Sequence, residues 1–147
     1  MLPGERLPAR TYRVTRGDLV RYAGASGDFN PIHWSERAAT AVGLPGVIAH
    51  GMYTMALAGR ALVDWAGGAD AVVDFGVRFT RPVAVPDDDT GVDVVVGGVV
   101  KPAVEEGCLR IDLTVTCGTD KVLGQARGVV REPRPAAGAG ADAGAVR

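Results

Sequence analysis

Apolar residues recur at every third or fourth position between residues 51 and 66, and almost nothing polar separates them. This spacing is typical of an α-helix, and a helix that is apolar nearly all round is expected to be buried. Gly67 and Gly68 follow directly, and glycine commonly ends a helix. The pattern predicts one long central helix, in which a charge at Leu57 or Leu62 would be strongly destabilising.

Strand-forming residues dominate the chain after this helix. Residues 72–79 are rich in valine and phenylalanine, and residues 93–100 form a second such run beyond an acidic turn. Residues 109–117 alternate apolar with polar side chains, as expected of an antiparallel strand buried on one face. Another turn leads into residues 122–131. We therefore expect an antiparallel meander of at least four strands.

Two shorter helices are expected before the central one. Residues 15–24 form the first, with Thr15 as its N-cap, and residues 36–42 form the second, with Ser35 as its N-cap. Between them, residues 28–33 contain a proline and several turn-forming residues, which argue against a helix.

A sheet wrapped around one long helix is the hotdog architecture, an α+β fold. A lone sheet of this kind leaves an edge and a pocket open, so pairing with a second subunit is expected. We predict one domain over residues 1–132. Residues 133–147, rich in alanine, glycine and proline, are expected to be a disordered tail.

Composition narrows the choice of partners and location. The net charge is −1 and no basic stripe is present, so nucleic acid is not an expected partner. The longest apolar run is too short to span a membrane, and the N-terminus lacks the apolar core of a signal peptide. A cytoplasmic location is the default expectation. The cysteines and histidines lack zinc-binding spacing, and we expect no metal.

The turn between the short helices contains the most informative residues of the chain. Asp28 and His33 flank it, and the turn can direct a carboxylate and an imidazole at one water molecule. Such a pair suits the addition of water to a double bond conjugated to a carbonyl group, or its reversal. Asn30, between them, is expected to order the loop or hold the aspartate.

The carbonyl oxygen of such a substrate gains negative charge during the reaction, so a hydrogen-bond donor is required nearby. Gly51 opens the long helix, where free backbone N–H groups and the positive end of the helix dipole meet. We assign its N–H to the substrate carbonyl. Asn30 and His50 are grouped with it on the substrate side, although a structural role is favoured for this histidine taken alone.

Three segments, residues 22–35, 48–52 and 77–83, resemble the MaoC-like, or (R)-specific enoyl hydratase, family of hotdog proteins. The resemblance covers about residues 8–132 and is most specific in the first segment. It implies reversible hydration of trans-2-enoyl thioesters to (3R)-hydroxyacyl thioesters, carried on acyl carrier protein (ACP) or coenzyme A, without a metal or organic cofactor.

By this resemblance Asp28 and His33 become the catalytic dyad and Gly51 the oxyanion donor. One departure concerns a serine that some hydratases carry on the central helix. The matching position is Gly59, and the nearest hydroxyl belongs to Thr54. A glycine there could deepen the acyl tunnel, which leaves chain-length preference open.

Within the family, the likeness is greatest to the catalytic subunits of mycobacterial-type (3R)-hydroxyacyl-ACP dehydratases, which work with a second hotdog subunit. A homodimer and a heterodimer both remain open for this chain. Candidate contacts for an acidic carrier protein or a coenzyme A phosphate are Arg60, Arg78, Arg81 and Lys101.

Three other functions are compatible with parts of this sequence. A non-catalytic hotdog subunit that binds acyl thioesters would not need both members of the Asp–His pair. A dehydratase of polyketide or other secondary metabolism has the same chemistry and stays an alternative. A hotdog thioesterase is disfavoured, because the long helix has no acidic residue before Asp64.

Overall fold

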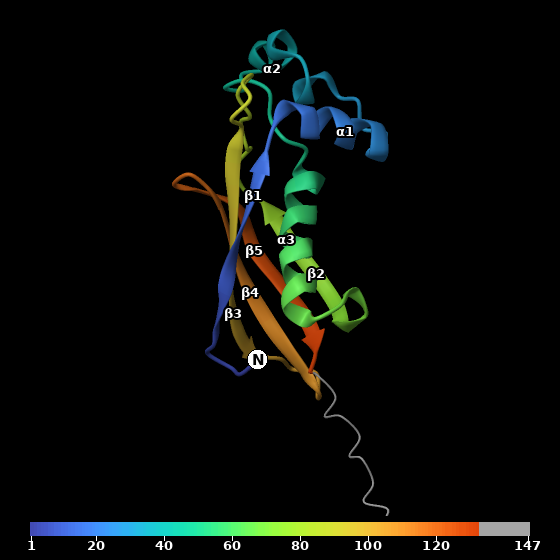
Figure 1. Cartoon of the computed structure of the whole chain (residues 1–147), viewed down its shortest axis with the longest axis vertical. Helices are drawn as coiled ribbons and strands as arrows, with labels where there is room; N and C mark the ends of the chain where they lie inside the picture. Colours follow the sequence, from blue (N-terminus) through green and yellow to red (C-terminus); the bar gives the residue numbers. More distant parts are fainter. Residues whose placement is uncertain (133–147) are drawn as a thin grey trace, which may run out of the picture.

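One antiparallel sheet forms most of the fold, and the long helix lies across one of its faces (Figure 1). The computed structural model describes residues 1–132. In this part of the chain the sheet has five strands in the order β1-β3-β4-β5-β2. The strands are β1 Arg6–Val14, β2 Val72–Phe79, β3 Val92–Pro102, β4 Cys108–Cys117 and β5 Asp120–Arg131. The expected α+β class is confirmed, whereas the tail predicted for residues 133–147 lies outside the described residues.

Three α-helices lie within the described residues: α1 Arg16–Ser26, α2 Glu36–Ala41 and α3 Gly51–Ala66. Short 3-10 turns occur at Pro31–His33 and Ala69–Ala71. The α1 and α2 helices gather at the end of the sheet where α3 begins (Figure 1). This arrangement brings the loop between α1 and α2 to the N-terminus of α3. Within residues 1–132, no helix is long and apolar enough to cross a membrane.

The strand predictions were correct in position but incomplete in topology. Strands β3, β4 and β5 form the expected meander, but β2 pairs with β5 and not with β3. Strand β1 was missed, because it is an edge strand in which only Leu7 and Val14 are buried. Its sequence therefore shows no alternation of apolar and polar residues. Strand β1 pairs with β3 and forms the edge of the sheet opposite β2.

Two helix predictions before α3 need correction. Helix α1 continues past residue 24 to Ser26 and ends at Gly27, whose φ of 75° places it in the left-handed region. Residues 31–33, expected to be non-helical, form one 3-10 turn with Pro31 at its first position. Proline is compatible with the first position of a helix, because the N–H that it lacks would have no partner there.

Helix α3 has the predicted bounds but is not buried on all sides. The buried positions form a single stripe: Thr54, Leu57, Ala58, Ala61 and Leu62. Met52, by contrast, is 57% exposed. The sheet of one chain covers one face of α3 and leaves the opposite face uncovered (Figure 1).

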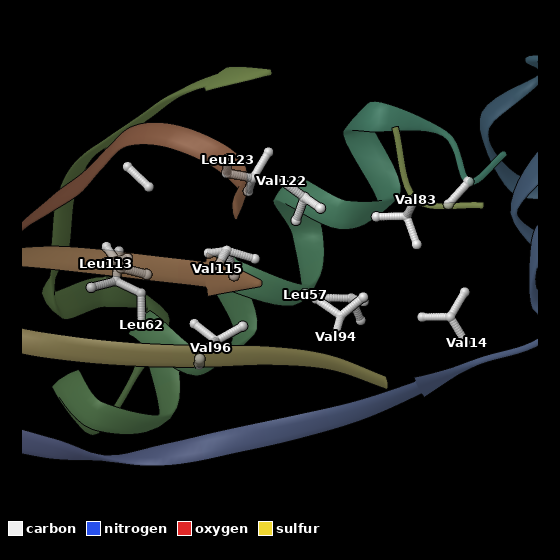
Figure 2. Close-up of a cluster of buried hydrophobic side chains, with 14 of the residues drawn as sticks. Val14, Leu57, Leu62, Val83, Val94, Val96, Leu113, Val115, Val122 and Leu123 are labelled. Atoms are coloured by element: carbon white, nitrogen blue, oxygen red, sulfur yellow. The ribbon is translucent and has the colours of Figure 1, made fainter. Parts of the chain in front are cut away.

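The core lies between this stripe and the inner faces of the strands, where leucine and valine side chains meet (Figure 2). Leu62 is 1% exposed, and a Cβ atom added at Gly128 would lie closer to its Cδ2 than van der Waals contact allows. No L side chain fits at such a distance without displacing Leu62. Gly128 on β5 therefore sets how closely α3 approaches the sheet.

We predict that Gly128→Ala lowers the free energy of unfolding by about 1–3 kcal/mol, because the new methyl group overpacks a filled core. The loss should shrink when Leu62 is also changed to alanine, since the clash is then removed. Gly97→Ala is the matched control, because a Cβ atom at Gly97 meets nothing within 4 Å. Urea denaturation of the unmodified protein, Gly128→Ala, Leu62→Ala and the double variant measures the coupling, and additive losses would contradict the packing described.

Candidate active site

The loop that follows α1 is fixed by hydrogen bonds of its own residues. Thr15 and Asp18 form a capping box that starts α1. At the other end, the Asp28 backbone N–H donates to Ser26 Oγ at 3.2 Å. The Asn30 backbone N–H donates to Asp28 Oδ1 at 3.1 Å, and the Ile32 backbone N–H donates to Asn30 Oδ1 at 3.3 Å. Asn30 thus caps the 3-10 turn, which agrees with the expectation that it orders the loop.

Asp28 uses its two carboxylate oxygens differently. Oδ1 accepts the hydrogen bond from Asn30, whereas Oδ2 lies 3.9 Å from His33 Nε2. The side chain of Asp28 is 52% exposed, while that of His33 is only 9% exposed. One oxygen therefore stabilises the turn, and the other faces the imidazole and solvent.

The ring of His33 is held by a main-chain carbonyl group. Its Nδ1 lies 2.8 Å from the carbonyl oxygen of Ile48. A carbonyl oxygen only accepts hydrogen bonds, so Nδ1 carries the hydrogen in the neutral ring and Nε2 keeps a lone pair. That lone pair lies on the atom closest to Asp28 Oδ2, so a water molecule can contact both groups at once.

His50 lies next to this pair and deeper in the protein. It is 1% exposed, and its ring stacks on that of His33 with centroids 3.8 Å apart and an angle of 23° between the planes. Its Nε2 lies 3.0 Å from the main-chain carbonyl oxygen of Asp28. By the same reasoning as for His33, Nε2 must be the protonated nitrogen of His50. The two rings therefore have opposite tautomers.

Residues 28–33 and 48–50 are joined by three reciprocal hydrogen bonds. His33 donates to the Ile48 carbonyl, His50 donates to the Asp28 carbonyl, and the Ile48 N–H donates to the Ile32 carbonyl at 3.2 Å. Each histidine is thus anchored on the segment that contains the other one.

A pocket of about 300 Å³ opens beside His33 and the first turn of α3. The residues that line it are His33, Ile48, Ala49, Gly51, Thr54, Phe79, Thr80, Arg81, Pro82, Val83, Val122 and Leu123. The wall is mostly apolar, but it includes Gly51 at the N-terminus of α3. The first N–H groups of a helix have no hydrogen-bond partner within the helix. The pocket therefore suits an apolar chain with a carbonyl group directed at the start of α3.

The predicted site residues fall into two groups. His33 and Gly51 line the pocket, whereas Asp28, Asn30 and His50 do not. Asp28 reaches the site through its contact with His33. His50 contacts the back of the pair and is too deeply buried to touch a substrate in this conformation. Its contacts are with the Asp28 main chain and the His33 ring, as a structural role predicts, and its grouping with the substrate-side residues stays a prediction.

Thr54 and Phe79, among the lining residues that were not foreseen as site residues, lie near the start of α3. Thr54 is 4% exposed, and its Oγ1 lies 3.5 Å from the carbonyl oxygen of His50. The ring of Phe79 lies 3.1 Å from where a Cβ atom of Gly51 would be, so only glycine fits beneath it comfortably. Gly59 is not among the lining residues, and its Cα faces Phe75 instead. It therefore does not deepen this pocket.

Charge at the pocket comes from one arginine. Arg81 is the only permanently charged side chain among the described lining residues, and its nearest acid is Asp120 at 3.7 Å. Arg60, by contrast, lies over the ring of Tyr12 with its guanidinium carbon 5.6 Å from the ring centre. Of the four basic residues considered from the sequence, only Arg81 lines this pocket.

Tyrosines close the site on the side of α1. Tyr22 meets His50 edge-on with centroids 4.9 Å apart, and Tyr53 lies 5.1 Å from Tyr22. Burial raises the pKa of Tyr53, and the negative charge of Asp18 raises it further. Tyr53 therefore stays neutral and adds no charge near the imidazoles.

The side chains of Asp28, His33 and His50 offer ligand atoms within 4.8 Å of one another. A metal ion shared by two histidines must lie in the plane of both rings, where the nitrogen lone pairs point. Rings stacked 3.8 Å apart at 23° do not direct their lone pairs at a common point. The arrangement fits proton transfer better than metal binding.

Comparisons with known proteins agree with this fold. The family model described as "MaoC like domain" matches residues 2–116. A solved structure named "MaoC-like dehydratase" superposes with a TM-score of 0.85 at 38% identity, covering 90% of this chain and 41% of that one. The fold is thus of the hotdog class that the layout of helix and strands predicted, and the chain belongs to the MaoC-like domain family.

Two curated relatives carry names with a stated activity. The 3-hydroxyacyl-thioester dehydratase X of Mycobacterium tuberculosis is 42% identical over 79 residues, which cover 54% of this chain and 27% of that protein. The 3-hydroxybutyryl-CoA dehydratase of Methylorubrum extorquens is 30% identical over 128 residues, 82% of this chain and 74% of that protein. The chain thus spans about a quarter of the first relative and most of the second.

We predict that the two histidines have opposite tautomers in solution, with hydrogen on Nδ1 of His33 and on Nε2 of His50. Long-range proton–nitrogen correlation spectra, recorded at a pH where both rings are neutral, distinguish the two forms. Because the chain has only two histidines, His33→Gln assigns both sets of signals. Identical tautomers would contradict the hydrogen bonds to Ile48 and Asp28.

Proposed function

We propose that this protein catalyses the reversible hydration of trans-2-enoyl thioesters to (3R)-hydroxyacyl thioesters, in fatty acid or related acyl metabolism. The observation that carries the proposal is the contact between Asp28 Oδ2 and His33 Nε2 at the edge of an apolar pocket. Family membership and the names of the two relatives support the same reaction. A cytoplasmic location remains a prediction from the sequence.

In the hydration direction, Asp28 and His33 hold the attacking water. His33 Nε2 takes a proton from it as the oxygen bonds to the β-carbon of the substrate. The electrons of the double bond move towards the thioester carbonyl, whose oxygen becomes negative. The dyad then returns the proton to the α-carbon, the carbonyl reforms, and both side chains regain their starting states.

The Gly51 N–H is proposed as the donor that stabilises the negative carbonyl oxygen. It lies at the positive end of the α3 dipole and in the pocket wall. The Phe79 ring covers this position from one side, so water is partly excluded where the charge develops. A hydrogen bond gains strength when competing water is removed.

We propose further that a second hotdog chain, identical or different, covers the site. The supporting observations are the half-exposed carboxylate of Asp28 and the large exposed apolar side chains on either side of the dyad. Phe29 is 63% exposed, Trp34 55% and Met52 57%. Large exposed apolar groups near a site favour contact with another protein.

We predict that Asp28→Asn and His33→Ala each lower kcat for crotonyl-CoA hydration by roughly 10²–10⁴-fold, the usual contribution of acid–base catalysis. Asparagine keeps the oxygen that accepts from the Asn30 N–H, so the loop should stay in place. Loss of enoyl-thioester absorbance measures the rate, and circular dichroism confirms folding.

Asp112→Asn is a matched control, because this half-exposed acid lies on β4 and pairs with Arg110. Full activity in a folded Asp28 or His33 variant would overturn the mechanism. Absence of activity in the folded unmodified protein would favour the alternative of a partner-dependent or non-catalytic subunit, which co-purification with a second hotdog chain can then test.

The carrier of the acyl group is proposed to contact Arg81, whether it is coenzyme A or a carrier protein. Both carriers have a phosphate at the end of the pantetheine arm. We predict that Arg81→Ala raises KM for crotonyl-CoA by roughly 2–5-fold, the scale of an exposed ion pair. KM for the N-acetylcysteamine thioester, which has no phosphate, should not change.

The matched control is Arg110→Ala, since Arg110 does not line the pocket. An equal change of KM for both thioesters would show that Arg81 contacts the shared part of the substrate rather than the carrier phosphate.

A further inference from the structure

The side chain of His50 contacts other residues of the site on several sides. Its Nε2–H donates to the Asp28 carbonyl, and its ring stacks on His33. On the remaining side, Tyr22 from α1 meets the ring edge-on. Its own backbone is the N-cap of α3, immediately before Gly51. One buried residue thus contacts the ring of His33 and the main chain of Asp28, and directly precedes Gly51 in the chain.

We propose that His50 is a positioning residue, which sets the distance between Asp28, His33 and the start of α3 without contacting the substrate. The predicted effect of His50 on the reaction rests on the proposed function, whereas its role in holding the loop does not. His50 does not line the pocket and is 1% exposed, so it acts through the other residues.

The position of Asp28 depends on a contact to its main chain. The Asx turn to Asn30 orients the carboxylate relative to its own loop, but does not join that loop to α3. Of the three hydrogen bonds that join residues 28–33 to residues 48–50, the 3.0 Å bond from His50 Nε2 to the Asp28 carbonyl is the one that holds Asp28 itself. Without this bond, the half-exposed Asp28 can move away from His33, and the 3.9 Å contact between the two side chains is lost.

The second nitrogen of His50 explains why the ring is suited to this task. Nδ1 is buried and has no hydrogen-bond partner among the described residues. A buried nitrogen without a partner takes no part in binding substrate, and the imidazole that lines the pocket is that of His33.

The test separates the two contacts of His50 by substitution. His50→Gln keeps an amide N–H that can reach the Asp28 carbonyl but loses the stacked ring. His50→Phe keeps the ring but loses the N–H. His50→Ala loses both. We expect kcat to fall by roughly 10–100-fold in the alanine variant, because displacement of a catalytic group by about 1 Å has effects of this size.

The glutamine and phenylalanine variants should each recover part of that loss, and KM should change by less than roughly threefold in all three. Ile111→Val is the control for general destabilisation, since Ile111 is fully buried in the sheet away from the site. It should lower the melting temperature without changing kcat.

A second readout does not depend on activity. In His50→Phe, backbone amide signals of Asn30 and Ile32 should shift and exchange hydrogen faster, because the loop has lost its anchor. In His50→Gln they should stay close to those of the unmodified protein. These measurements hold even if the protein proves inactive with enoyl thioesters, so failure of the proposed function and failure of this inference are distinguishable.

Three outcomes would overturn the inference. The first is an unchanged kcat in folded His50→Ala. The second is an effect that falls on KM alone, which would make His50 a substrate contact. The third is a loss of kcat that follows the melting temperature across all variants, including Ile111→Val.

Discussion

The close approach of α3 to the sheet determines where every group of the site can lie. The helix packs through a stripe that includes Ala58 and Ala61, both completely buried, and through Leu62 against Gly128. Small residues at this contact let the helix axis come near the strands, and a close-packed core resists sliding or rotation. The N-terminus of α3 is therefore fixed relative to β2 and β5, which contribute Phe79, Val122 and Leu123 to the pocket wall.

Because the start of α3 is fixed, the segment that precedes it can act as an anchor for a loop that has no core of its own. Residues 28–33 are mostly exposed, and their own turn bonds are local. The reciprocal bonds with residues 48–50 transfer the rigidity of the helix to this loop. Precise placement of acid–base groups usually requires support of this kind from neighbouring hydrogen bonds.

Much of this arrangement could be predicted from the sequence, because the signals are local. The bounds of α3 follow from its periodicity and its terminal glycine, and the caps at Thr15 and Ser35 are as expected. Strand β1 and the pairing of β2 with β5 could not be predicted, since edge strands show little alternation and strand order depends on contacts distant in sequence. The burial of His50 could not be predicted either, because only tertiary structure places Tyr22 and His33 around it.

Asp28 illustrates why structural and catalytic interpretations of one residue need not compete. An aspartate in a turn most often bonds the backbone two residues later, and Oδ1 of Asp28 makes such a bond with Asn30. A carboxylate has two oxygens with several lone pairs, so this bond leaves Oδ2 free beside His33. The turn bond also fixes the rotation of the carboxylate plane, which a purely solvent-exposed aspartate would lack. The local bond is thus a condition for the proposed chemistry, since it limits the directions in which the second oxygen can point.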